Sequence, residues 1–117
     1  MKREMDLIRA VVLAAESGNP NGSITGYTDE QVRYHRALAI EANLLKGRVH
    51  KPSTYLTDIP DDVVILGITY DGHDFIDAIR EDSKWDQVKQ LLLEAGKQIT
   101  IETIKYAVKQ LFGFPPA

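Results

Sequence analysis

The sequence of 117 residues contains no cysteine, and it has no long apolar run. Without cysteine, disulfide frameworks, thiolate nucleophiles, zinc sites with cysteine ligands and iron–sulfur clusters are all excluded. The longest apolar runs, 11–15 and 63–68, are far shorter than the ~20 residues that a membrane-spanning helix needs. We therefore expect a cytoplasmic protein that does not enter a membrane.

A strong charge of one sign is also missing, because 14 Lys and Arg stand against 17 Asp and Glu, for a net charge of -3. This balance disfavours indiscriminate binding to nucleic acid, so only a local basic patch would bind it. The hydrophobic content of 44% is sufficient for the core of one compact domain with a short appendage.

The N-terminal segment has apolar residues at the three- and four-residue spacing of one helix face. They are Met5, Ile8, Val12 and Ala15, with Leu7 and Val11 beside them. The spacing predicts a helix over 2–17. The next residues, 17–22, combine glycine, proline and an Asn-Gly pair, which indicates a turn. The β-branched segment 23–26 predicts a short edge strand.

A second helix begins with a capping box, in which the Thr28 hydroxyl and the Gln31 side chain each bond to the other residue's backbone amide. The pattern predicts a helix over 28–43, ending at Asn43, a residue that tolerates a left-handed backbone. The residues expected to face the core are Val32, Leu38, Ala39 and Ala42.

The helical period disappears over 44–69, where β-favouring residues flank a turn at 58–62. This pattern predicts a hairpin with a long loop. Three helices are expected after it. The first spans about 70–82, the second is capped by Ser83 and stops at Gly96, and the third runs from Thr100 to Gly113.

This order of elements resembles a winged helix with one core helix shortened or missing. The segment 27–45 resembles the recognition helix and strand entry of winged-helix repressors, with Arg36 where those helices usually have leucine. The segment 69–72 resembles the Leu-Thr-x-x-Gly motif that ends the wing. We expect an α+β, mostly helical fold, with a winged helix-turn-helix-like domain over 1–82 and a C-terminal two-helix extension over 83–117.

Three separated motifs carry a more specific resemblance. They are the opening 1–9, the segment 26–45, and the segment 69–82 with Trp85. Together they are similar to an uncharacterised domain family of bacteria and their phages whose members open Met-Lys-Arg-Asp-Met-Asp. The resemblance implies a winged-helix-like fold and a mobile-element setting, and it supplies no activity.

Polar and basic residues gather on the outward side of the capped helix and just beyond it, with Arg36 at the border of the core-facing stripe. The candidate DNA-binding residues are Gln31, Arg33, Tyr34, Arg36, Lys46, Arg48 and Lys51. Arginine and glutamine read guanine and adenine edges in the major groove, while lysine and arginine contact phosphates. We expect double-stranded DNA as the partner and a role in transcriptional control.

Two features oppose this interpretation, and the same residues also fit an ordinary solvated surface. Asp29 and Glu30 lie in the first turn of the helix, and the wing turn 58–62 carries carboxylates that repel phosphates. The alternative function is a non-enzymatic protein-protein interaction module, of phage origin and acting on a host factor.

Signs of catalysis are few. His73 and Asp77 are four residues apart on a predicted helix and would share a face, but no second histidine lies nearby in the sequence. There is no glycine-rich phosphate loop and no Ser-His-Asp spacing. We expect no enzymatic activity, no cofactor and no metal.

Each of the last two predicted helices carries an apolar stripe, and the two helices have more apolar residues than a small domain usually needs to cover. The stripes are Trp85, Val88, Leu92 and Ala95 on the first and Ile101, Ile104, Val108 and Leu111 on the second. This excess favours a homodimer formed through residues 84–112, since a two-fold axis also suits DNA half-sites. The alternative is that both helices fold back on the first helix within one chain.

Overall fold

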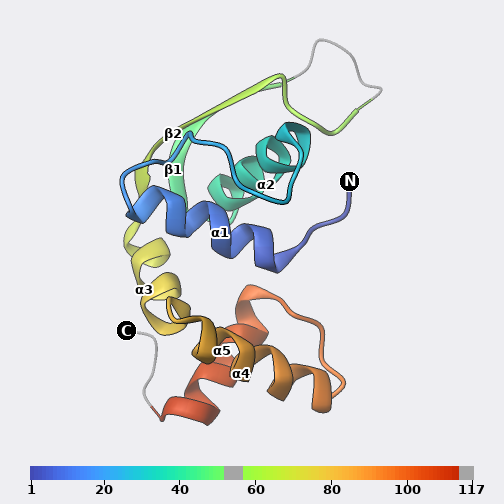
Figure 1. Cartoon of the computed structure of the whole chain (residues 1–117), viewed down its shortest axis with the longest axis vertical. Helices are drawn as coiled ribbons and strands as arrows, with labels where there is room; N and C mark the ends of the chain where they lie inside the picture. Colours follow the sequence, from blue (N-terminus) through green and yellow to red (C-terminus); the bar gives the residue numbers. More distant parts are fainter. Residues whose placement is uncertain (52–56, 114–117) are drawn as a thin grey trace. The chain divides into compact units, whose positions relative to one another are not determined.

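The computed structural model describes residues 1–51 and 57–113. In these ranges the elements are α1 (Met5–Glu16), α2 (Asp29–Glu41), β1 (Leu45–His50), β2 (Asp62–Ile68), α3 (Tyr70–Ile79), α4 (Asp82–Glu94) and α5 (Ile101–Phe112) (Figure 1). The expected α+β, mostly helical class is confirmed, and the predicted helices and hairpin form with small shifts of their ends.

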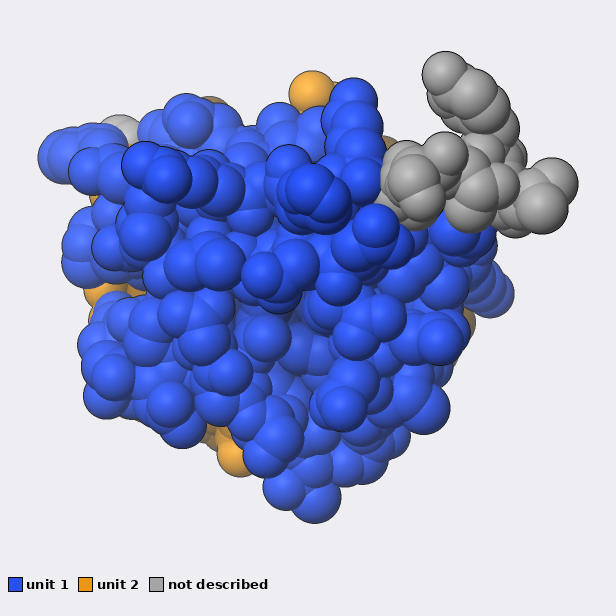
Figure 2. All heavy atoms as spheres, turned by 90° about the horizontal axis from the view of Figure 1, so that it is seen from above, with its two compact units in different colours: residues 1–73 blue, residues 74–117 orange. Residues whose placement is uncertain are grey.

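The chain divides into two compact units, residues 1–73 and residues 74–117 (Figure 2). The division falls within α3, N-terminal to the boundary that the sequence predicts at residues 82 and 83. The first unit therefore holds α1, α2 and the hairpin, and the second holds α4 and α5.

The core of the first unit is built by α1, α2 and the hairpin, which pack against one another. Its side chains are Leu7, Ile8, Val11, Val12, Val32, Ala39, Leu45, Val63 and Ile65, all buried. The predicted core position Ala42 is wrong, because Ala42 is the C-cap residue of α2 and lies exposed. In α1 the prediction is confirmed, because the buried residues include those that the apolar spacing places on one face.

The capping box at the start of α2 is confirmed. The Thr28 hydroxyl accepts from the Gln31 backbone N–H at 3.1 Å, and the Gln31 amide oxygen accepts from the Thr28 backbone N–H at 2.9 Å. At the other end Asn43 has a φ of 62°, as its position after the helix predicts. The Leu44 N–H then bonds to the Ala39 carbonyl at 2.9 Å, which completes a Schellman turn into β1.

The two strands form an antiparallel sheet in which Arg48 lies opposite Val64 and His50 opposite Asp62. The register shifts at Lys46, which pairs with Gly67, so the extra residue belongs to β2. Because β1 itself is regular, its alternate residues from Lys46 to His50 share one face of the sheet.

The predicted edge strand over 23–26 is wrong, since these residues have no strand conformation. The edge of β2 is instead bonded by a side chain, that of Asn21. Its amide oxygen accepts from the Ile65 N–H at 2.9 Å, and its amide nitrogen donates to the Ile65 carbonyl at 3.1 Å. The Asn21 amide therefore satisfies the N–H and the carbonyl of Ile65, two of the backbone groups to which a third strand would have bonded.

The turn into α3 explains the Thr-x-x-Gly motif. The Thr69 hydroxyl accepts from the Gly72 N–H at 2.9 Å and donates to the Asn43 carbonyl. A Cβ at Gly72 would lie 2.0 Å from the Leu44 carbonyl oxygen, so only glycine fits against this backbone.

In the second unit α4 packs against α5. Trp85, Val88 and Leu92 of α4 are buried, as are Ile104 and Val108 of α5. These are the apolar stripes that the sequence predicts for the two helices.

The ends of these helices follow the sequence only in part. The predicted cap at Ser83 is wrong, because the extended residue that opens α4 is Glu81, which leaves Ser83 inside the first turn. In α5 the Thr100 hydroxyl accepts from the Thr103 N–H at 3.1 Å, and the left-handed Gly113 ends the helix, so both predicted ends are confirmed. Within residues 1–51 and 57–113, no helix is long and apolar enough to cross a bilayer.

Candidate functional site

The predicted DNA-reading residues of α2 are mostly engaged within the protein. The Gln31 amide oxygen belongs to the capping box. The Arg33 Nε donates to the Pro60 carbonyl at 3.2 Å, which ties the middle of α2 to the loop before β2. Tyr34 is half-buried, and its ring meets the His35 ring edge-on at 5.4 Å between centroids.

His35 lies behind this face and is only 1% exposed. Its Nε2 accepts from the Glu4 N–H at 2.9 Å, and its Nδ1 lies 2.8 Å from the Gln31 carbonyl oxygen. A carbonyl only accepts, so Nδ1 carries the proton and the ring is the neutral Nδ1–H tautomer. His35 thus joins the start of α1 to α2 as a structural residue.

Arg36 is 8% exposed, which corrects its predicted place at the border of the outward face. One Nη donates to the Gly22 carbonyl, while Nε is buried without a hydrogen-bond partner among the described residues. Burial lowers the pKa of Arg36 below its ordinary value, and the nearby Asp29 carboxylate partly offsets this effect. Arginine still remains protonated at neutral pH, so a charge is held inside the unit.

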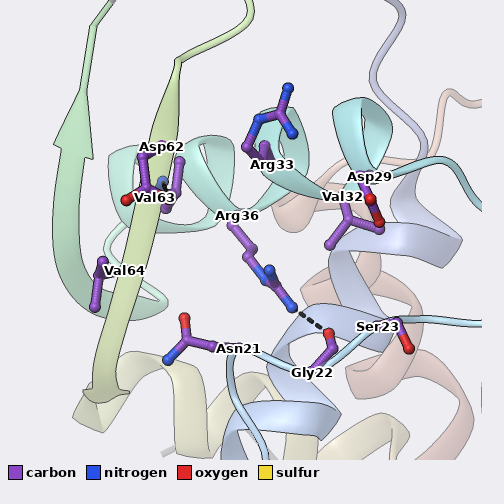
Figure 3. A pocket seen from close by; sticks show the side chains of 10 residues that line it. All are labelled: Asn21, Gly22, Ser23, Asp29, Val32, Arg33, Arg36, Asp62, Val63 and Val64. Atoms are coloured by element: carbon purple, nitrogen blue, oxygen red, sulfur yellow. Dashed lines mark hydrogen bonds between the residues drawn. The ribbon is translucent and has the colours of Figure 1, made fainter.

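The Arg36 side chain crosses a cavity between α2, residues 21–23 and the start of β2 (Figure 3). The cavity has a volume of about 340 Å³. Its lining residues are Asn21, Gly22, Ser23, Asp29, Val32, Arg33, Arg36, Asp62, Val63 and Val64. Two arginines, two aspartates and three valines therefore meet in one concave site.

The basic residues of the hairpin lie apart from this cavity. Lys46, Arg48 and His50 alternate along β1 and are all exposed, and Lys51 follows, also exposed. Among the described residues, none of these side chains forms an ion pair. Lys46 and Arg48 share one face of the sheet, whereas Arg36 is buried, so the seven candidate DNA-binding residues do not all lie on one exposed surface.

The β2 half of the same sheet face is apolar. Val64, which lies opposite Arg48, is exposed, and Leu66 in the bulge is 63% exposed. Only Asp62 at the end of the strand adds an acidic group, opposite His50. The face therefore has a basic edge and an apolar edge.

The chain was compared with known proteins. A family model with the description "Hypothetical protein (DUF2513)" matches residues 2–98. The chain belongs to the DUF2513 family. A relative from Haemophilus influenzae, described as an uncharacterized protein, is 27% identical over an alignment of 117 positions that covers 95% of each of the two chains. No solved structure matches the chain. The membership confirms the uncharacterised family that the three motifs indicate.

The second unit of this DUF2513 protein carries an exposed apolar surface. Leu93 is 73% exposed, and Tyr106 and Leu111 are also exposed. A shallow cavity of about 470 Å³ lies beside Leu111, lined by polar residues of α4 and by Leu91. The predicted apolar excess of residues 84–112 is therefore partly outside the core.

The metal ligands that the sequence suggests do not assemble into a site. In the part of the chain that the structure describes, no three His, Asp or Glu side chains lie close enough together to hold an ion. Asp77 instead pairs with Arg80 at 2.6 Å on the surface of α3.

Sequence reasoning missed the roles of Asn21 and Asp29. The sequence predicts that Asn21 is a turn residue in an Asn-Gly pair, but its side-chain amide bonds to the backbone of Ile65 in β2. Asp29 reads as an acidic residue of a helix start, yet it faces the same cavity as Arg36. One signal in the sequence indicated a buried polar site. Arg36 occupies a position at which the recognition helices of winged-helix repressors usually have leucine.

Proposed function

We propose that this DUF2513 protein is a non-enzymatic, cytoplasmic, winged-helix-like protein that binds double-stranded DNA, as a transcriptional regulator of a phage or prophage. The observation that carries the proposal is the basic face of β1. Lys46, Arg48 and His50 lie at alternate positions, so neighbouring side chains are ~6.5 Å apart along the strand. Two unpaired cations, Lys46 and Arg48, with a histidine next along the same exposed strand face, suit contact with a phosphate backbone.

The contacts within α2 favour phosphate contact over base reading. Gln31 and Arg33 are already bonded within the protein, and Arg36 is buried. Asp29 and Glu30 at the helix start also repel the DNA backbone. We therefore place the DNA contact on the hairpin and expect modest sequence preference.

Fluorescence anisotropy with a labelled duplex of random sequence tests the proposal. Binding should weaken steeply as salt rises, because each phosphate contact releases counterions. Failure to bind duplex DNA at low salt would contradict it.

A homodimer through residues 84–112 is the second part of the proposal. Exposed Leu93, Tyr106 and Leu111 support it, because a partner chain would remove their apolar surface from water. A two-fold dimer would also present two hairpins to two half-sites of a duplex.

A protein-binding module remains the alternative, and the apolar edge of the hairpin favours it. Val64 and Leu66 lie exposed beside Arg48, an arrangement that fits a partner with both apolar and acidic groups. One variant distinguishes the two functions. Leu66→Ser should weaken binding to a protein partner and leave the salt dependence of DNA binding unchanged.

A further inference from the structure

The cavity beneath α2 contains a charged group whose hydrogen bonds are incomplete. Arg36 is nine-tenths buried, and its Nε has no acceptor among the described residues. Leaving a buried donor unpaired is costly, and the cost is greater for a charged group. An acceptor oxygen from outside the protein would remove this cost, and a carboxylate matches the planar guanidinium best.

The other lining groups define the rest of the ligand. Arg33 and Arg36 are balanced by Asp29 and Asp62, so the lining has no net charge. A simple anion would be attracted by the arginines and repelled by the aspartates. The exposed Asp29 carboxylate interacts with Arg36 electrostatically but forms no hydrogen bond or ion pair with a described residue, so its oxygens can still bond to a cation. The lining thus favours a molecule that carries both charges.

Size and polarity point to the same kind of molecule. The volume of about 340 Å³ is near the lower end of ligand sites, which usually measure ~300–1,000 Å³. Val32 and Val63, which are both buried, supply apolar walls for a small side chain. Asn21 is held in place in the lining, because both ends of its amide are bonded to Ile65.

We propose that this cavity binds a small zwitterion of amino-acid size. The carboxylate accepts from the Arg36 Nε–H, the ammonium group faces Asp29, and an aliphatic side chain contacts the valines. The cavity shares Asp62 and Val64 with the sheet face of β1, but none of the basic residues of β1 lines it, so the inference does not depend on DNA binding.

Solution NMR of the full-length protein, observing the Arg36 Nε–H signal, tests the proposal. The probes are L-valine, isovalerate, which lacks the amine, and isobutylamine, which lacks the carboxylate. L-valine should shift the signal saturably, and each analogue should bind about tenfold or more weakly, because one charge-assisted hydrogen bond is lost. No saturable shift with L-valine, or an equal response to isovalerate, would overturn the proposal.

Substitutions identify the groups involved. Asp29→Asn should remove the preference for L-valine over isovalerate, and Arg36→Lys should abolish binding of both. Glu30→Gln is the matched control, because it removes the same charge from the neighbouring position, which does not line the cavity. Loss of binding in Glu30→Gln equal to that in Asp29→Asn would show a general charge effect and overturn the assignment of the ammonium site. If Arg36→Lys does not fold, the wild-type titration and Asp29→Asn still decide the question.

Discussion

The side-chain amide of Asn21 makes both of its hydrogen bonds to one residue, Ile65, accepting from its N–H and donating to its carbonyl. This pairing covers part of the open edge of β2, where exposed backbone groups would otherwise invite another strand. It also fixes the neighbouring Gly22 carbonyl, to which the Arg36 guanidinium donates. One short loop thus completes the sheet and holds the charged group of the cavity.

Asn21→Ala should lower the free energy of unfolding by ~1–2 kcal/mol, because the two part-buried backbone groups of Ile65 lose their partner. Amide hydrogen exchange checks this most locally, since the Ile65 N–H should lose protection. Asn19→Ala is the control, because Asn19 lies in the same turn with an exposed side chain. Unchanged protection of Ile65 in Asn21→Ala would show that the bond contributes nothing.

His35→Leu should destabilise the protein by ~1–3 kcal/mol, because the Glu4 N–H loses its acceptor while the volume is roughly kept. Chemical denaturation followed by circular dichroism measures the loss. His73→Leu, at an exposed histidine, should change the stability by less than ~0.5 kcal/mol. Long-range proton–nitrogen NMR should find the proton of His35 on Nδ1, and a proton on Nε2 would contradict the assigned tautomer.

Local signals in the sequence predicted the structure well. The capping box at Thr28, the helix start at Thr100, the left-handed Asn43 and the apolar stripes of α1 and α4 depend on residues within one or two helical turns of each other. The hairpin was also predictable, because β-branched residues on both sides of a turn favour paired strands. These features fixed the fold class.

The candidate site was less predictable, because its contacts join distant segments. Arg36 bonds a carbonyl 14 positions away, and Asn21 bonds a strand residue 44 positions away. No periodicity marks such pairs. The sequence therefore predicted Arg36 at the border of the core-facing stripe and a strand at 23–26, whereas the structure has a buried arginine and a side-chain pairing. The winged-helix resemblance directed attention to α2 and away from the cavity beside it.

Arg36→Met should change the free energy of unfolding by less than ~1 kcal/mol. The variant loses the bond to the Gly22 carbonyl but also removes a buried charge with an unpaired Nε, and the two effects oppose each other. Urea denaturation of the variant and the wild type gives the difference. A loss of several kcal/mol would show that Arg36 is chiefly a structural residue.

Leu93→Asp and Leu111→Asp should shift a dimer towards monomer, because a charge would be buried in an apolar interface. Sedimentation equilibrium at micromolar concentration measures the mass. Leu66→Asp, a similar change in the first unit, should leave the association unchanged. A wild-type protein that stays at 13.1 kDa would contradict the dimer.

The slope of the DNA binding constant against salt concentration tests the proposed function most directly. For a random duplex, the double variant Lys46→Ala/Arg48→Ala should bind more weakly and show a log–log slope smaller by about 2, at ~0.9 for each lost phosphate contact. The control Lys2→Ala/Arg3→Ala removes the same charge from two exposed residues before α1, outside the proposed dimer interface, and should keep the wild-type slope. Equal slopes in the wild type and the β1 variant, or no binding by the wild type at low salt, would contradict a DNA-binding role for the hairpin.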